Sequence, residues 1–90
     1  MTSIEVRPAG GDEYEVAVHS SGARTVHRVR VSEAERMKYG AGATAERLLE
    51  ESFRFLLERE PATSILSRFD LSTIERYFPE YASEIRKRVG

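Results

Sequence analysis

Alternating apolar and polar residues mark the first third of the chain. Ile4 and Val6 alternate with charged neighbours, and residues 14–18 repeat this period of two. A third alternating segment covers residues 24–31, after a turn-forming stretch rich in serine and glycine. Successive side chains of a strand point to opposite faces, so this period indicates half-buried β-strands. The sequence therefore predicts a three-stranded antiparallel β-meander over residues 1–31.

The hairpin between the second and third predicted strands allows two registers. A two-residue turn at 21–22 would place Tyr14 opposite Val29, whereas a turn at 22–23 would place it opposite Val31. Both registers bring apolar side chains to one face and opposite charges to the other. The sequence supports the hairpin and leaves its register open.

From Ser32 onward the apolar spacing changes to three and four residues. Ser32 followed by Glu35 fits a capping box, which predicts a short helix from residue 33 to about residue 39. Thr44 is placed to cap a second helix after a glycine-rich break. Apolar residues then recur on one face, which predicts a long amphipathic helix from residue 45 to about residue 60.

Short helical segments are expected over the last third of the chain. Ile65, Leu66 and Phe69 indicate one turn of helix, and residues 72–75 fit a second capping box. The spacing of apolar residues and a basic end predict a final helix over residues 80–89.

These elements predict the α+β class and one domain over residues 1–90. An N-terminal three-stranded antiparallel meander (1–31) is followed by one long amphipathic helix and several short helices (32–90), without α/β alternation. The predicted core contains Ile4, Val6, Tyr14, Val16, Val18, Val29, Val31, Leu48, Leu49, Phe53, Leu56, Ile65, Leu66, Phe69, Ile74 and Phe78.

Composition narrows the class of protein. The 90 residues are 40% hydrophobic and 32% charged, which is ordinary globular usage, and the formal net charge is −1. Without cysteine, the chain has no disulfide, thiolate metal site or cysteine nucleophile. It contains no apolar run of membrane-spanning length and does not begin with a signal-peptide pattern, so we expect a cytoplasmic protein with no membrane contact.

Few residues suggest chemistry. His19 and His27 flank the predicted turn on opposite faces of the hairpin, so they cannot bind one metal together. His27 falls on the apolar face, which predicts a structural histidine. No spacing of histidines, carboxylates or serines matches a metal or nucleophile motif. We therefore expect no enzyme activity, no catalytic residue, no metal and no cofactor.

The only basic segment lies in the third predicted strand. Arg24, Arg28 and Arg30 are candidate nucleic-acid contacts, because a strip of arginines attracts phosphates. The favoured alternative pairs Arg28 and Arg30 with Glu13 and Glu15 across the hairpin, which would neutralise most of that charge.

Residues 27–59 resemble a ribbon-helix-helix pattern. An alternating strand (27–31), a capped short helix, a small-residue turn and the helix after Thr44 carry the resemblance, which covers about a third of the chain. It implies a dimeric DNA-binding regulator or antitoxin whose paired strands read the major groove. The hairpin partners predicted for strand 27–31 depart from that pattern.

The C-terminal half is similar to a set of short bacterial proteins of uncharacterised function. The similarity rests on FLLEREP (55–61), IL..FDL (65–71) and RYFPEY (76–81), and extends over roughly residues 27–86. It implies a shared fold and no activity.

The leading functional interpretation is a non-enzymatic protein-interaction or regulatory module that binds a protein partner or self-associates as a dimer. Its support is the absence of catalytic motifs and the wide apolar face of helix 45–60, with Phe55 at its margin. The alternative is a ribbon-helix-helix-like DNA-binding regulator or antitoxin that uses Arg24, Arg28 and Arg30. A small-molecule or enzymatic pocket between sheet and helices is the third interpretation.

Overall fold

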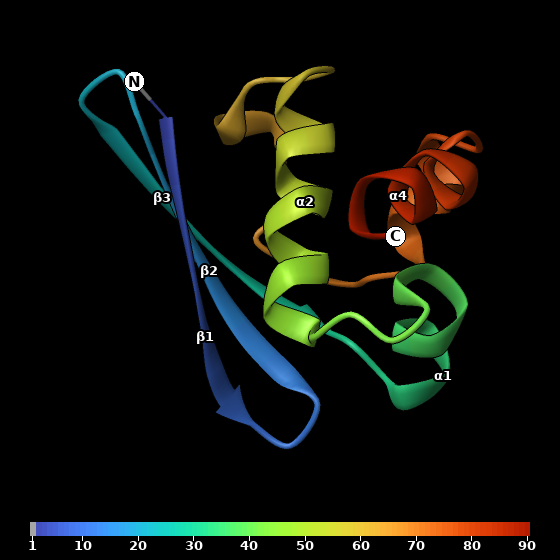
Figure 1. The fold of residues 1–90 in the computed structure, drawn as a ribbon. Helices are drawn as coiled ribbons and strands as arrows, with labels where there is room; N and C mark the ends of the chain where they lie inside the picture. Colours follow the sequence, from blue (N-terminus) through green and yellow to red (C-terminus); the bar gives the residue numbers. More distant parts are fainter. Residues whose placement is uncertain (1) are drawn as a thin grey trace.

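The fold is a four-stranded sheet with all helices on one of its faces (Figure 1). The computed structural model describes residues 2–90. The α+β class is confirmed, and so is the antiparallel meander β1-β2-β3. In chain order the elements are β1 (Thr2–Gly10), β2 (Glu13–Ser20), β3 (Ala23–Arg30), α1 (Glu33–Glu35), the π-helical segment η1 (Arg36–Gly40), α2 (Ala45–Leu57), the 3₁₀ turn η2 (Ala62–Ser64), β4 (Arg68–Asp70), α3 (Thr73–Tyr77) and α4 (Tyr81–Val89).

A fourth strand extends the predicted meander. β4 runs parallel to β3, with the Arg28 N–H donating to the Ser67 carbonyl at 2.7 Å and the Leu71 N–H donating to the Arg30 carbonyl at 3.0 Å. The helical turn predicted around Phe69 is therefore wrong, and the part of the chain predicted to be helical also supplies a strand. The open side of β3 offers backbone hydrogen bonds to this segment, and these outweigh the preference for a helical turn that the spacing of its apolar residues indicates.

The backbone at the hairpin tip selects the first of the two registers. Ser21 and Gly22 both have positive φ, 52° and 80°. Positive φ at both central residues defines a type I′ turn, whose twist matches that of the flanking strands. Tyr14 consequently lies opposite Val29, and the register with Val31 as its partner is excluded.

Two of the three predicted helix caps are present. Ser32 and Glu35 form the predicted capping box, and the Thr44 hydroxyl accepts from the Arg47 N–H at 3.1 Å. The second capping box is wrong, because the Ser72 side chain accepts no capping hydrogen bond. α2 ends at Leu57 and is shorter than predicted.

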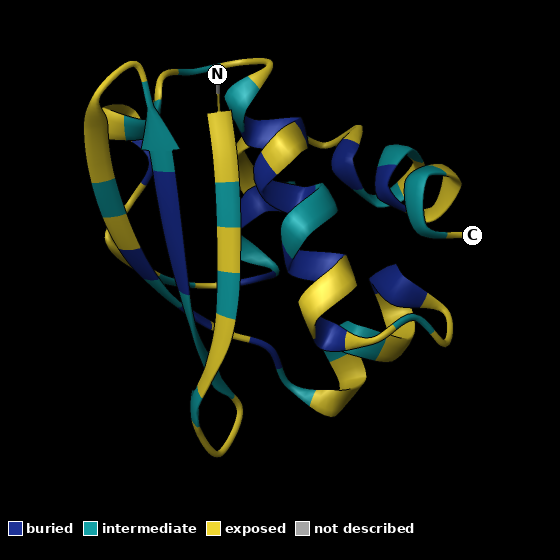
Figure 2. Ribbon diagram, turned by 60° about the vertical axis from the view of Figure 1, so that its left-hand side comes forward, coloured by how far each residue is buried: buried dark blue, intermediate teal, exposed yellow. Residues whose placement is uncertain are grey.

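α2 lies between the sheet and α4, and both sides of its apolar face are buried (Figures 1 and 2). Phe55 is fully buried, with its ring 5.3 Å from that of Tyr81 and 6.0 Å from that of Phe78. The wide apolar face of this helix therefore packs internally and gives no support to partner binding. Tyr39, Phe55, Leu71, Tyr81 and Ile85 belong to the core without having been predicted there, and Leu66 was placed there wrongly.

No helix within residues 2–90 has the length and apolar character needed to cross a membrane.

Candidate interaction surface beside strand β4

An open, mainly apolar hollow of about 220 Å³ lies between β4 and α3. Ile65 and Ile74 are buried in its floor, and Phe69 of β4 forms part of its wall. Leu66 and Tyr77 stand at its rim, where they are 47% and 67% exposed. Large apolar side chains on a concave surface are typical of interaction sites. This hollow is called the β4 groove below.

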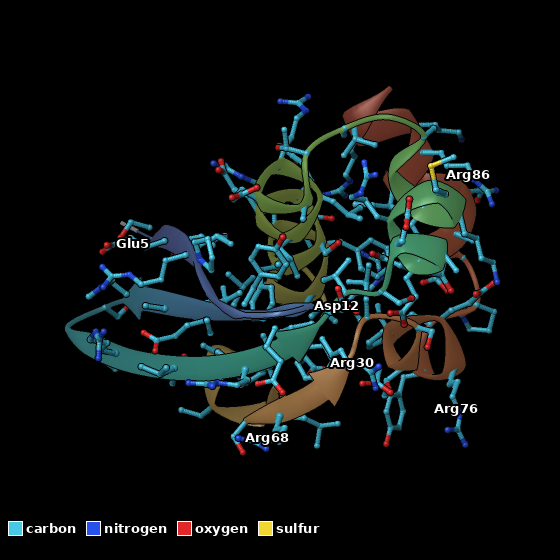
Figure 3. The ribbon with its side chains drawn as sticks, turned by 90° about the horizontal axis from the view of Figure 1, so that it is seen from below. Glu5, Asp12, Arg30, Arg68, Arg76 and Arg86 are labelled. Carbon is cyan, nitrogen blue, oxygen red and sulfur yellow. The ribbon has the colours of Figure 1, made fainter. Side chains whose placement is uncertain are left out.

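The groove adjoins a sheet edge that can form further hydrogen bonds. Ser67 and Leu71 direct backbone groups toward β3, so by alternation the N–H and C=O of Arg68 and Asp70 point away from it. No strand of residues 2–90 pairs with that outer side. Figure 3 shows β4 as the outermost strand, with Arg68 at the edge.

His27 fixes the segment that leads into β4. The residue is 2% exposed, and its Nδ1 donates to the Leu66 carbonyl at 2.8 Å. Because a carbonyl only accepts, Nδ1 carries a proton, and in the neutral ring Nε2 accepts from the Thr25 hydroxyl at 2.9 Å. The prediction of a structural histidine agrees with this geometry, and the contact holds Leu66 at the groove rim.

Glu35 fixes the start of α3, the opposite wall of the groove. One carboxylate oxygen accepts from the Ser32 N–H and the other from the Ser72 N–H, each at 2.8 Å. Burial raises the pKa of the Glu35 carboxyl, but the backbone donors of Ser32 and Ser72 outweigh it, so the pKa lies below its ordinary value. One carboxylate thus joins the beginning of α1 to the beginning of α3.

A second carboxylate, that of Glu75 on α3, helps to explain why the predicted capping box of residues 72–75 does not form. Glu75 accepts from the Tyr39 hydroxyl at 2.6 Å and from the Lys38 ammonium at 3.2 Å. These two hydrogen bonds, Tyr39 first, hold the pKa of Glu75 below its usual range. Burial, together with the bond to Glu75, raises the pKa of the Tyr39 phenol. Glu75 therefore ties α3 to η1, while the Ser72 N–H that it would accept in a capping box donates to Glu35 instead.

The three candidate arginines lie on the outer face of the sheet, which no helix of residues 2–90 covers (Figure 1). Arg28 contacts Glu13 at 3.3 Å, diagonally across the hairpin. Arg30 lies opposite Glu13, as the first register predicts, but neither Arg24 nor Arg30 forms an ion pair within the described chain. Arg68 of β4, which the sequence did not single out because its segment looked helical, lies directly opposite Arg28.

The remaining candidates stay apart. His19 contacts Glu5 at 3.2 Å on the outer face, whereas His27 is buried on the inner face, as predicted. Over residues 2–90 there is no cluster of three or more side chains suited to hold a metal ion. A larger hollow of about 280 Å³ lies at the hairpin tip, and its polar lining comes largely from threonines and Ser20.

Comparison with protein-family models, with curated proteins and with solved structures finds no match to this chain. The similarity to short bacterial proteins and the ribbon-helix-helix resemblance therefore stay predictions. In the structure β3 is hydrogen-bonded to β2 on one side and to β4 on the other. Residues 28–30 of β3 therefore have no open edge with which to form the intermolecular ribbon that the second resemblance implies.

Proposed function

We propose that the protein is a non-enzymatic interaction module of the bacterial cytoplasm that binds an extended segment of a partner protein at β4. The segment adds a strand to the outer side of β4 and places an apolar side chain in the β4 groove. The observation that carries this proposal is the open backbone edge of Arg68 and Asp70 beside a groove rimmed by Leu66 and Tyr77.

Strand addition uses both features of this surface. The added backbone satisfies the outward-pointing groups of β4, which supplies binding energy without reading sequence. Every second side chain then faces the groove, and pockets for alternate side chains supply selectivity. Tyr77 suits this role because exposed aromatic side chains are frequent anchors of protein interfaces.

The opposite sheet edge is less suited to the same role. β1 contains Pro8, which offers no N–H, and the pairing register shifts between Pro8 and Gly10. Proline and irregularities of this kind protect edge strands from pairing with other chains. Glu5 and Arg7 add charge along the outer face of β1. The chemistry of the two edges therefore favours β4.

DNA binding is the second candidate function, because Arg68 extends the strip of Arg24, Arg28 and Arg30 onto the neighbouring strand. Against it, Glu13 and Asp70 lie within the same surface, and the chain carries a net charge of −1. A phosphate-directed surface would bind duplex DNA strongly at low salt and lose affinity steeply as salt rises. A titration of a mixed-sequence duplex at two salt concentrations separates the two functions, and we expect no binding.

Selection from a displayed library of random peptides tests the interaction module. Enriched peptides should bind the wild-type protein and lose affinity for the Tyr77→Ser and Leu66→Ser variants, while binding to Met37→Ser is unchanged. Met37 is a matched control because it is 60% exposed and does not line the groove. Circular dichroism confirms that each variant is folded.

Hydrogen exchange then tests the mode of binding. The bound peptide should slow exchange of the Arg68 and Asp70 amides, whereas the Arg28 amide, already bonded to Ser67, is slow with or without it. A library that yields no enriched peptide, or peptides that leave the Arg68 and Asp70 amides unprotected, would overturn the proposal.

A further inference from the structure

The outer face beside the β4 groove carries two arginines directly opposite each other. Arg28 of β3 is in register with Arg68 of β4. Like charges in opposing positions of a sheet destabilise each other. Glu13 neutralises Arg28, but Arg68 has no carboxylate within 4 Å among residues 2–90. Positive charge therefore remains uncompensated at the edge where a strand would be added.

Other charged groups restrict where a carboxylate on that strand would be favourable. Asp70 lies opposite Arg30 and occupies the far end of β4. Glu60 lines the groove itself, on the inner side of the sheet. Arg76 of α3 is exposed and projects from the same side of the molecule as Arg68 (Figure 3). Acidic side chains are thus favoured on the outer side near Arg68, and apolar side chains are favoured on the inner side.

We propose that the segment bound at β4 is an acidic strand with alternating apolar residues. Its apolar side chains enter the β4 groove, and the intervening carboxylates lie on the outer face beside Arg68 and Arg28. The period of two that separates these side chains is that of any β-strand. The inference rests on the proposed function and adds the charge of the bound segment to it. Attraction between an acidic segment and this basic edge also accelerates encounter between the two chains.

Three synthetic peptides of nine residues, labelled for fluorescence anisotropy, test the charge. They alternate valine with glutamate, with serine or with lysine. One exposed ion pair strengthens binding by up to about fivefold, so the glutamate peptide should bind tighter than the serine peptide by about that factor at low salt. The lysine peptide should bind weakest, and added salt should reduce the differences among the three.

Matched arginine variants locate the effect. Arg68→Ser should remove most of the advantage of the glutamate peptide and leave the affinity for the serine peptide unchanged. Arg7→Ser is the control, because Arg7 lies on the same outer face of the opposite edge strand β1. It should change none of the three affinities. A glutamate peptide that binds no tighter than the serine peptide, or an advantage that survives Arg68→Ser, would overturn the inference.

The outcomes also separate the inference from the proposed function. If all three peptides bind equally and Tyr77→Ser weakens all of them, strand addition stands and the acidic preference is wrong. If none binds, both are wrong. Light scattering over a dilution series should give a monomer, whereas a dimer dissociated by Tyr77→Ser would make a second copy the occupant. A last competitor is duplex DNA, tested by its ability to displace the glutamate peptide. If Arg24→Ser weakens that DNA binding and Tyr77→Ser does not, nucleic acid is the occupant of this surface.

Discussion

Replacing Glu35 with glutamine should destabilise the protein far more than the same change two residues earlier. In the wild type, both carboxylate oxygens of Glu35 accept backbone N–H groups, from Ser32 and from Ser72. Glutamine keeps one acceptor and turns an NH₂ donor toward the other N–H. One charge-assisted hydrogen bond is lost and the other becomes a neutral one, which costs about 2–3 kcal/mol of unfolding free energy.

The matched control is Glu33→Gln in the same helical turn. The Glu33 side chain is exposed and accepts no hydrogen bond within the described residues, so only its favourable interaction with the helix N-terminus is lost. That interaction contributes about 0.3–1 kcal/mol. Thermal unfolding followed by circular dichroism should therefore show Glu35→Gln melting about 8–24 °C below the wild type, against a few degrees for Glu33→Gln.

The pH dependence of the difference identifies its cause. The pKa of Glu35 in the folded protein is depressed below its ordinary value of 4.5. Its stabilising contribution is therefore complete above that value and is lost as pH falls through the lower pKa of the folded state. The difference in melting temperature between wild type and Glu35→Gln should close as pH falls below 4.5. The other carboxylates with lowered pKa are present in both proteins, so their protonation does not contribute to this difference. A gap that stays constant with pH, or a Glu35→Gln variant as stable as Glu33→Gln, would refute the reasoning.

Three further predictions concern the core and the hairpin. Ser52→Ala should lower the unfolding free energy, measured in urea, by about 1–3 kcal/mol, since the buried hydroxyl of Tyr81 loses the partner it has at 2.6 Å. Tyr81→Phe should lower it by only about 0.5–1.5 kcal/mol, since the Ser52 hydroxyl still donates to the Leu48 carbonyl. Gly22→Ala should destabilise the protein by about 1–2 kcal/mol because φ is +80° there. Ser21→Asn should stabilise it slightly, since asparagine tolerates positive φ at this turn position. If both variants shift the urea midpoint in the same direction, the type I′ assignment is wrong. Phe55→Ala should cost about 3–5 kcal/mol by the same assay, and a near-neutral change would show that this ring does not serve the core.

Features that depend on neighbouring residues along the chain could be predicted from the sequence. The period of two located the three strands of the meander, and the helical period located α2 and α4. The caps at Ser32 and Thr44 were also predictable, because each side chain bonds to a backbone group only three residues away. These signals are local, so no knowledge of distant contacts was needed to read them.

The candidate site depended on contacts between distant parts of the chain. β4 forms because residues 68–70 reach the open side of β3, a pairing that spans about forty residues and overrides the local helical spacing. The same pairing brings Arg68 beside Arg28, and it leaves Leu66 exposed at the groove rim. Local spacing along the chain carried no sign of either position.

The same distinction explains what the sequence did not show about α2 and Glu35. The wide apolar face of α2 was read as a docking surface, but α4 covers it through Tyr81 and Ile85, which the sequence did not assign to the core. Glu35 was predicted as a cap, yet its second oxygen holds Ser72, thirty-seven residues away. By itself, then, the sequence determined the three strands of the meander, α2 and α4, since these elements follow from local periodicity and capping. Only the tertiary structure decided which apolar and charged surfaces stay open, since that depends on which elements cover one another.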